Sequence, residues 1–351
     1  MGIRVLVVDD SLVVRSVLTR ELAAEPDIEV VGAAPDPFVA REMILAQRPD
    51  VITLDMEMPR MDGLTFLRKV MYYHPLPVIV VSSLTAAGST VAVEALRAGA
   101  VDVVGKPSSG DTAGLRTELV AKIRHAAQAK VRQITAPLAP APTSAKAPVA
   151  PKPVGPVSAG KLIAIGASTG GPQALEAVLT ALPAEAPAVV IVQHMPPGFT
   201  QTFADRLDTM CAIRVREAAD GDALRPGTAL IAPGGYHLIV RGHPGDYQAQ
   251  VREGPLVSQH RPSVDVLFRS VAKAAGSRAV GVLMTGMGRD GARGLLEIRE
   301  ARGFTIAQDE ATSVVYGMPR EAVEIGAAMR IEPLERIATA ALYGQARSRE
   351  G

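Results

Sequence analysis

The stretch that decides the fold of the first half of the chain is VLVVDDS, residues 5–11. Four apolar residues followed by a charged turn are typical of a buried parallel strand that ends at a polar sheet edge. Three further short apolar runs lie at residues 51–54, 78–81 and 101–104. Because longer segments with helical apolar spacing separate these runs, the sequence predicts a doubly wound α/β domain with helices on both faces of a parallel sheet.

Polar side chains follow the predicted strands at the point where each strand ends. Asp9 and Asp10 follow the first strand, Asp55 follows the third, and Ser82 and Lys106 follow the fourth and fifth. The carboxyl ends of parallel strands meet at one edge, so we expect these groups to gather there. Three carboxylates at one place repel one another, and a bound Mg²⁺ ion is the simplest way to offset this repulsion. Any single Asp could instead be an ordinary turn residue.

Residues 161–171, KLIAIGASTGG, predict a strand that enters a glycine-rich turn. Gly166, Ser168 and Gly170 fit the pattern G-x-S-x-G, in which a tight turn exposes a serine hydroxyl at a helix N-terminus. Two other interpretations stay open. Ser168 or Thr169 could simply cap the helix, or the loop could hold a phosphate, although no Lys-Ser/Thr pair follows the glycines.

A serine nucleophile needs a base, and His194 directly follows the apolar run AVVIVQ at residues 188–193. If that run is the strand next to the one before Ser168, the two side chains lie within reach of a proton transfer. His237 and His260 are the rival candidates. A lone histidine at a strand end is otherwise more often a packing or capping residue.

The third predicted group is Asp290, in the segment AVGVLMTGMGRDG at residues 279–291. A carboxylate there would orient the imidazole, and the backbone N–H of Met287 would be exposed to stabilise an oxyanion. The alternative is that Asp290 caps a helix that starts near Ala292. The chain order Ser168, His194, Asp290 differs from the orders of the α/β-hydrolases, chymotrypsin and subtilisin, so the triad would be an independent arrangement.

The composition predicts two domains and a linker. Residues 136–160 hold seven Pro and seven Ala with no acidic or aromatic side chain, so we place a linker at 126–160 between domains at 1–125 and 161–351. The net charges of these segments, −3 for the first domain, +4 for the linker and zero for the last domain, argue against nucleic-acid binding. One cysteine and the lack of a long apolar run favour a cytoplasmic protein with no membrane insertion.

The first 120 or so residues resemble the response-regulator receiver family through VLVVDDS, TLDMEMPRMDG, VIVVSS and VVGKP. The resemblance implies a flavodoxin-like fold that is phosphorylated on an aspartate with the help of Mg²⁺. The residues at the matching positions are Asp55 as phosphoacceptor, Asp9, Asp10, Asp55 and the Glu57 backbone carbonyl as metal ligands, Ser82 as the switch hydroxyl, Lys106 as the phosphate-binding cation, and a cis bond between Lys106 and Pro107.

Residues 161–345 resemble the chemotaxis protein-glutamate methylesterase family through GASTGGP, QHMPPGFTQTFADRL, IAPGGYHL, HRPSVDVLF, MTGMGRDGARG and QDEATSVVYGMPREA. The implied activity is hydrolysis of glutamate methyl esters on methyl-accepting chemoreceptors, with deamidation of selected glutamines as a second activity. The implied site comprises Ser168 as nucleophile, His194 as general base and acid, Asp290 as its orienting carboxylate, the Met287 N–H in the oxyanion hole, and Thr169 in support.

The same resemblance implies two partners and an internal contact. The phosphodonor would be the chemotaxis histidine kinase, and the substrate a chemoreceptor. An unphosphorylated receiver would cover the catalytic face, so that phosphorylation of Asp55 uncovers it. Two rival functions remain: a receiver joined to a non-catalytic docking or transcription module, and a nucleotide-binding domain that uses residues 166–171.

Overall fold

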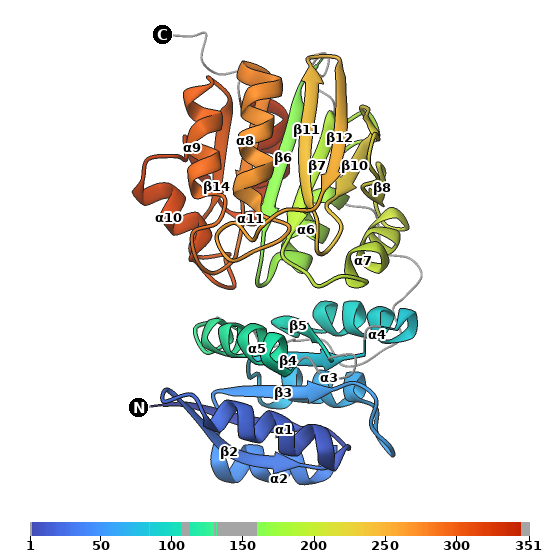
Figure 1. Ribbon diagram of the computed structural model, residues 1–351, viewed down its shortest axis with the longest axis vertical. Coiled ribbons are helices and arrows are strands. Elements are labelled where there is room, and N and C mark those ends of the chain that lie inside the picture. The colour runs from blue at the N-terminus through green and yellow to red at the C-terminus, as the bar shows by residue number, and fades with distance from the viewer. Residues whose placement is uncertain (1, 84, 107–111, 130, 132–159, 345–351) are drawn as a thin grey trace. The chain divides into compact units, whose positions relative to one another are not determined.

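The computed structural model describes residues 2–83, 85–106, 112–129, 131 and 160–344. The chain divides into two compact units, Met1–Thr143 and Ser144–Gly351, each described here by itself (Figure 1). Nearly all of the predicted linker at 126–160 lies outside the described residues, so the predicted domain limits stay a prediction. Among the described helices, none combines the length and the apolar character needed to cross a membrane.

Strands and helices alternate along the first unit, as the apolar runs predict. They are β1 (Ile3–Val8), α1 (Leu12–Ala23), β2 (Ile28–Ala34), α2 (Pro37–Gln47), β3 (Val51–Asp55), α3 (Gly63–Tyr73), β4 (Val78–Ser82), α4 (Ala86–Arg97), β5 (Asp102–Gly105) and α5 (Thr112–Ala126). All strand pairs are parallel and the order is β2-β1-β3-β4-β5. This is the flavodoxin-like order, and it brings the ends of β1 and β3 side by side.

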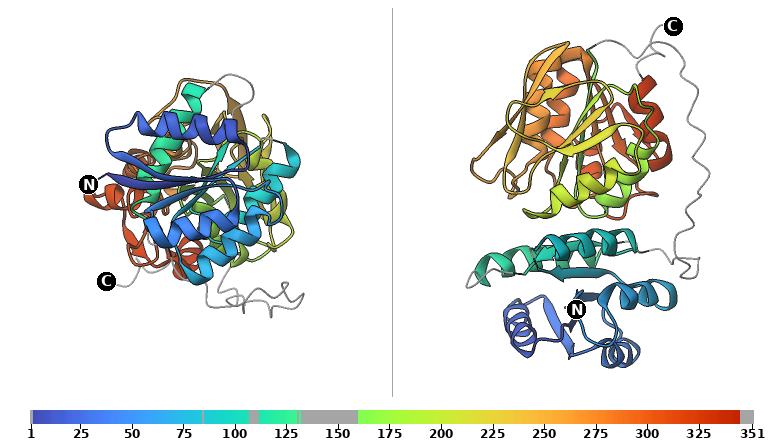
Figure 2. Two further views of the ribbon diagram at one scale, coloured as in Figure 1. Left: turned by 90° about the horizontal axis from the view of Figure 1, so that it is seen from below. Right: turned by 90° about the vertical axis from the view of Figure 1, so that its right-hand side faces the viewer.

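Helices cover both faces of this five-stranded sheet (Figure 2). Leu18 and Leu22 of α1 and Leu119 and Ile123 of α5 join alternate side chains of β1 in one buried cluster. The strand β2 was missed by the search for apolar runs. Its side chains are mostly half-buried at the sheet edge, so it lacks the continuous apolar run of a central parallel strand.

The second unit contains more strands than its glycine-rich motifs predict. Its elements are β6 (Leu162–Ala167), α6 (Gly171–Thr180), β7 (Ala188–Gln193), α7 (Phe199–Asp208), β8 (Arg214–Glu217), β9 (Ala223–Leu224), β10 (Thr228–Ile231), β11 (His237–His243), β12 (Asp246–Arg252), α8 (Val264–Ala275), the 3₁₀ turn η1 (Gly276–Arg278), β13 (Ala279–Leu283), α9 (Ala292–Glu300), β14 (Phe304–Gln308), α10 (Met318–Glu324), β15 (Arg330–Glu332) and α11 (Leu334–Tyr343).

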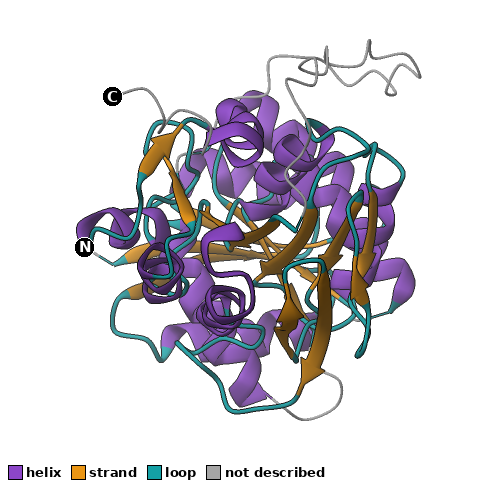
Figure 3. Ribbon diagram, turned by 90° about the horizontal axis from the view of Figure 1, so that it is seen from above, coloured by secondary structure: helices purple, strands orange, loops and turns teal. Residues whose placement is uncertain are grey.

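A seven-stranded parallel sheet forms the centre of this unit, in the order β15-β14-β13-β6-β7-β10-β8. Helices flank the strands (Figure 3), and α8 and α9 lie on the same face as the hairpin β11–β12. The prediction of two doubly wound parallel-sheet domains is confirmed by this sheet and that of the first unit. The antiparallel sheet β11-β12-β9 is an addition that the sequence analysis did not predict.

The sheet order decides where the predicted site residues lie. β6 is central, with β7 on one side and β13 on the other. Ser168 follows β6, His194 follows β7, and Asp290 lies in the loop after β13. Since all three strands are parallel, the three side chains emerge at the same sheet edge.

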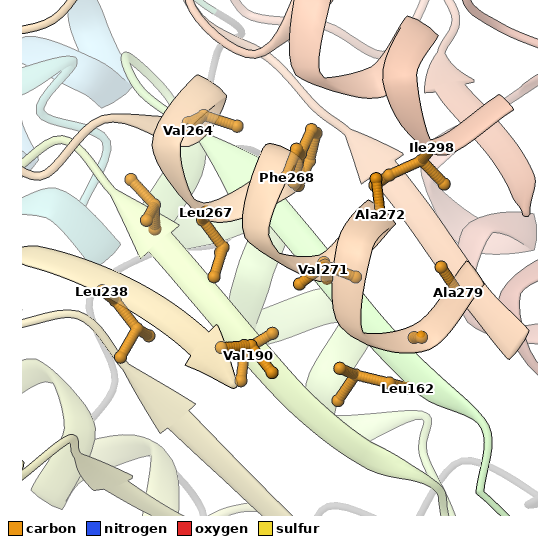
Figure 4. Packing of buried hydrophobic residues seen from close by; sticks show 14 of the residues in the cluster. Leu162, Val190, Leu238, Val264, Leu267, Phe268, Val271, Ala272, Ala279 and Ile298 are labelled. Carbon is orange, nitrogen blue, oxygen red and sulfur yellow. The ribbon is translucent and has the colours of Figure 1, made fainter. Parts of the chain in front are cut away.

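The helix α8 is held close to this edge by glycines and by its apolar face. Leu267, Phe268 and Val271 pack over β6, β7 and β11 (Figure 4). A Cβ atom at Gly166 would overlap the side chain of Val264, and one at Gly294 of α9 would lie 2.6 Å from Cβ of Phe268. The glycines therefore set how near the first turn of α8 approaches the ends of the strands.

Candidate active site and phosphoacceptor site

Ser168 sits in a tight turn between β6 and α6. Its backbone N–H donates to the Thr285 carbonyl at 3.0 Å, and its own carbonyl accepts the N–H of Gly171 at 2.7 Å. Gly170 has φ of +76° and serves as the N-cap residue of α6, which has no side-chain cap. The N-cap position therefore belongs to Gly170, and Ser168 lies two residues before it.

His194 is tied to the serine turn by its backbone and by its neighbour Gln193. The His194 N–H donates to the carbonyl of Ala167 at 3.1 Å. Gln193 Nε2 donates to the carbonyl of Ser168 at 2.9 Å and to that of His194 at 3.1 Å. Adjacent parallel strands lie about 4.8 Å apart, so these bonds hold the residues that carry the hydroxyl and the imidazole beside each other.

Asp290 is buried, 1 % exposed, and its two carboxylate oxygens accept four hydrogen bonds. Oδ2 lies 2.9 Å from His194 Nε2 and accepts the N–H of Val264 at 2.8 Å. Oδ1 accepts from the Ser263 hydroxyl at 2.8 Å and from the N–H of Asp265 at 3.1 Å. Burial alone would raise the pKa of Asp290, but the bonds from His194, Ser263 and Val264 hold it below its ordinary value.

Asp290 bonds the first turn of α8, whose N-cap residue is Ser263, and this corrects the alternative drawn from the sequence. The helix near Ala292, α9, begins after Gly291 and has no side-chain cap. Asp290 instead accepts N–H groups from the first turn of α8, at Val264 and Asp265. A carboxylate at a helix N-terminus meets the positive end of the helix dipole, so α8 helps to keep Asp290 ionised while it contacts His194.

These hydrogen bonds decide which ring nitrogen of His194 can accept a proton. The ionised Asp290 accepts, so His194 Nε2 carries the proton and Nδ1 presents a lone pair. Nδ1 is buried and has no hydrogen-bond partner within the described residues. The structure therefore contains the hydrogen bond between His194 and Asp290, whereas the described residues show none between the Ser168 hydroxyl and His194 Nδ1. Such bonds to a nucleophile are often long before substrate binds.

Met287 and Thr169 lie on either side of the serine turn. A Cβ atom at Gly286, the residue before Met287, would lie 2.7 Å from Cβ of Ser168, so this loop touches the serine directly. The N–H of Met287 donates to no group among the described residues. The carbonyl of Thr169 accepts from the Thr285 hydroxyl at 2.9 Å. The residue before the predicted oxyanion donor thus lies against the predicted nucleophile.

The two rival histidines occupy different places. His237 is buried, with Nδ1 accepting the N–H of Ser263 at 3.2 Å and Nε2 donating to the carbonyl of Pro255 at 2.9 Å. Both its nitrogens are used by the backbone, so His237 is not placed to act as a base. The ring of His260 stacks on that of His194, with centroids 3.7 Å apart and planes 13° apart.

In the first unit, Lys106 joins the buried aspartates of the predicted phosphorylation site. Its Nζ lies 2.9 Å from Asp55 Oδ1 and 3.1 Å from Asp9 Oδ2. Burial raises the pKa of Asp55, the charge of Asp9 adds to this, and Lys106 opposes both. For Lys106, burial would lower the pKa, but the bonds with Asp55 and Asp9 raise it.

The remaining predicted residues of this unit are placed as follows. Ser82 is buried at the end of β4, and its carbonyl accepts the N–H of Lys106 at 2.7 Å. The N–H of Glu57 donates to Asp55 Oδ1 at 3.3 Å. Pro107, and with it the predicted cis bond after Lys106, lies outside the described residues.

The acidic residues fit a divalent cation by their chemistry and spacing. One carboxylate oxygen from each of Asp9, Asp10 and Asp55 lies within 4.8 Å of the others. Hard oxygen ligands of this kind suit Mg²⁺. Asp10 is exposed, whereas Asp9 and Asp55 are buried, so the cluster opens to solvent on one side. The three predicted side-chain ligands are therefore brought together.

Three residues that support the site were missed by the sequence analysis. They are Ser263, which bonds Asp290; Gln193, which bonds the serine turn; and Gln308, whose Oε1 accepts the N–H of Thr285 at 2.8 Å. Gln193 and Gln308 are polar residues at the ends of otherwise apolar runs, β7 and β14. Such a buried amide at the end of a parallel strand is the signal that would have found them.

Comparison with known proteins identifies the family of the chain. A family model described as CheB methylesterase matches residues 163–341, more than half of the chain. The chain belongs to the CheB methylesterase family. A second model, the response regulator receiver domain, matches residues 5–119. The predicted family is thereby confirmed for both units.

Two curated relatives of the CheB methylesterase family match almost the whole chain. The protein-glutamate methylesterase/protein-glutamine glutaminase 4 of Anaeromyxobacter dehalogenans is 55 % identical over 96 % of this chain and 93 % of its own length. The protein-glutamate methylesterase/protein-glutamine glutaminase 2 of Pseudomonas aeruginosa is 52 % identical over 100 % of this chain and 99 % of its own. The crystal structure of the Thermotoga maritima CheB methylesterase catalytic domain is 38 % identical, with a TM-score of 0.51, and covers 53 % of this chain and 98 % of that domain.

Proposed function

We propose that the chain is a receiver-regulated protein-glutamate methylesterase and protein-glutamine glutaminase of chemotactic adaptation, with Ser168, His194 and Asp290 as its catalytic triad. The observation that carries the proposal is the bond of 2.9 Å between His194 and the buried, fourfold-bonded Asp290 at the strand edge that also bears Ser168. A docking module would have no use for an imidazole held by a carboxylate beside a serine turn.

The first half of the reaction is acyl transfer to Ser168. Oγ of Ser168 attacks the carbonyl carbon of the side-chain ester, and Nδ1 of His194 accepts the hydroxyl proton. The N–H of Met287 donates to the oxygen that becomes negative. When the tetrahedral intermediate collapses, His194 returns the proton to the leaving group, which departs as methanol, or as ammonia from a glutamine.

The second half restores the enzyme. A water molecule attacks the acyl-serine carbonyl and gives its proton to His194 Nδ1, which then passes it to the Ser168 oxygen as the ester bond breaks. The product is a glutamate side chain. Throughout, Asp290 stays ionised and stabilises the imidazolium, which its lowered pKa favours. Thr169, next to the nucleophile, supports the turn through its carbonyl bond with Thr285.

The first unit supplies the regulation. A carboxylate oxygen of Asp55 attacks the phosphorus of a phosphodonor, the donor's own bond to phosphorus breaks, and the donor group leaves with that bonding pair. Lys106 and Ser82 bind the oxygens of the resulting acyl phosphate. Asp9, Asp10, Asp55 and the carbonyl of Glu57 are the groups that would hold Mg²⁺, which when bound would neutralise phosphoryl charge during transfer. The new dianion draws Lys106 away from Asp9 and recruits Ser82, which biases a two-state surface of the receiver.

The partners follow from the family and belong to the proposal. The substrate is a methyl-accepting chemoreceptor, the phosphodonor is the chemotaxis histidine kinase, and the unphosphorylated receiver covers the catalytic face through an interface within the chain. A chemoreceptor's methylated helices and a soluble kinase meet at the inner side of the membrane, so a cytoplasmic location is part of the same proposal.

Release of methanol from methylated receptor membranes tests the function. We expect turnover by the wild-type chain, stimulation by a small phosphodonor with Mg²⁺, and loss of turnover in Ser168→Ala with the melting temperature unchanged. A fluorophosphonate probe should label the wild type and not this variant. Retained turnover in Ser168→Ala would remove the serine from its role, and protection by nucleotide without labelling would favour the nucleotide-binding alternative.

A further inference from the structure

The stacking of His260 on His194 is a contact that the proposed reaction does not use. The ring centroids are 3.7 Å apart and the planes differ by 13°, so one face of His194 is covered by a second imidazole. The ring of His194 is only 8 % exposed. Because Asp290 contacts Nε2 at the ring edge, the two neighbours hold different parts of the same ring.

A strained turn carries His260 to this position. Val257 and His260 pair through two backbone bonds, of 3.1 Å and 2.9 Å, around the two-residue turn Ser258–Gln259. Both turn residues have positive φ, 51° and 67°, although neither is glycine. Such conformations cost on the order of 1 kcal/mol or more each and persist only where the surroundings enforce them. That the turn persists at this cost in conformational energy indicates that the position of His260 is fixed by its surroundings.

The residues that hold this turn in place also contact the proposed catalytic residues. His237 bonds the carbonyl of Pro255 and the N–H of Ser263, so it ties the two ends of the loop to one buried ring. The Ser263 hydroxyl in turn donates to Asp290 Oδ1. The loop that ends in Ser263 is therefore fixed to the same carboxylate that holds His194.

We propose that His260 is a positioning residue for His194. A hydrogen bond to Asp290 fixes one atom of the imidazole but leaves the ring free to tilt about that contact. A parallel ring on one face removes this freedom and fixes the direction in which Nδ1 points, which proton transfer requires. The inference rests on the proposed function in one respect: it takes Nδ1 as the proton acceptor.

Matched variants separate stacking from other roles of this side chain. His260→Phe keeps a flat ring, His260→Gln keeps hydrogen-bonding groups without a ring, and His260→Ala keeps neither. His243→Ala, at an exposed position of β11, is the control. For each full-length variant the measurements are kcat and KM for methanol release, the rate of Ser168 labelling by a fluorophosphonate, and the melting temperature.

We expect His260→Ala and His260→Gln to lose roughly ten- to a hundredfold in kcat and in labelling rate. KM and the melting temperature should stay near wild type, and His260→Phe should recover most of the loss. An equal loss of kcat in His260→Phe and His260→Ala, or an effect on KM alone, would overturn the proposal. If the wild type labels at Ser168 but releases no methanol, the substrate assignment fails, while the ranking of the labelling rates still decides the role of His260.

Discussion

His194 Nε2 lies 2.9 Å from Asp290 Oδ2, which leaves Nδ1 as the nitrogen free to accept a proton. In chymotrypsin the aspartate contacts Nδ1 and the serine faces Nε2. The present arrangement inverts this assignment. The base and the carboxylate follow strands on opposite sides of the strand that precedes the serine.

The two histidines that both looked plausible in the sequence should differ sharply when replaced. His194→Gln removes the proton acceptor, so we expect kcat for methanol release to fall by at least roughly a thousandfold. His237→Gln loosens a loop and should cost roughly tenfold. Steady-state kinetics of both variants at one pH gives the ranking, and the reverse order would make His237 the base.

Asp290→Asn should lower both activity and stability. An amide presents one acceptor oxygen where the carboxylate has two, so its NH₂ must face donors on one side, such as the Asp265 N–H and the Ser263 hydroxyl. We expect kcat to fall by roughly 10³- to 10⁴-fold and the free energy of unfolding by about 1–3 kcal/mol. Kinetics and denaturant unfolding measure the two losses. Unchanged stability would contradict the bonding described for this carboxylate.

The low pKa of Asp290 also gives a direction for pH. A carboxyl whose folded pKa lies below its unfolded value of 3.8 contributes stability that is present above that value and is lost as the pH falls through the folded pKa. Between pH 5 and 7 this carboxyl is ionised in both the folded and the unfolded chain, so its own titration should not change the free energy of unfolding of the catalytic unit, which denaturant unfolding at a series of pH values measures.

Asp55→Asn should leave basal hydrolysis intact and abolish its stimulation. An amide cannot attack phosphorus, and it also loses the ion pair with Lys106 at 2.9 Å. We expect a small phosphodonor with Mg²⁺ to raise methanol release by the wild type and to have no effect on the variant. A normal response in Asp55→Asn would place the phosphorylation site elsewhere.

Gly294→Ala should destabilise the catalytic unit although alanine favours helices. The propensity gain is about 1 kcal/mol, but the new Cβ would lie 2.6 Å from Cβ of Phe268 and 3.1 Å from the Asp265 carbonyl. Overpacking of this kind costs about 1–3 kcal/mol, so we expect a small net loss in denaturant unfolding. A gain in stability would show that α8 and α9 can separate without cost.

Lys161 should make the stability of the catalytic unit depend on alkaline pH. Burial lowers the pKa of Lys161 to about 8 from 10.5, while Nζ donates to the Leu342 carbonyl at 2.8 Å. Between these pH values the unfolded chain binds the extra proton, so stability rises with pH in this window. Calorimetry of wild type and Lys161→Met should show their difference in melting temperature changing between pH 7.5 and 10, in favour of the wild type. A constant difference would mean that Lys161 keeps its charge throughout.

Much of the site could be predicted because strand ends are a local signal. Ser168 and His194 directly follow apolar runs, and Asp290 lies in the glycine-rich loop that follows another. In parallel sheets such residues meet at one edge whatever the strand order. The same reasoning placed Asp9 and Asp55 beside Lys106. The resemblance to known families added the roles, which spacing alone leaves open.

What the sequence could not supply depends on contacts between distant segments. The choice between Nδ1 and Nε2 depends on which side of His194 the β13 loop occupies. The bonding of Asp290 to the first turn of α8 instead of α9 depends on how closely Gly166 lets Val264 approach. The short strand β9 and the pairing of β11 with β12 form a separate antiparallel sheet, which continuous apolar runs do not indicate because buried and exposed side chains alternate along β12.

The position of β13 beside β6 has a consequence for biosynthesis. Ser168 and His194, two residues of the proposed triad, follow β6 and β7, but the third, Asp290, is encoded 96 residues after His194. A nascent chain that ends before residue 290 would hold the serine turn and the imidazole without the carboxylate that bonds both α8 and the ring. The proposed triad therefore becomes complete only after β13 has been translated, long after the receiver.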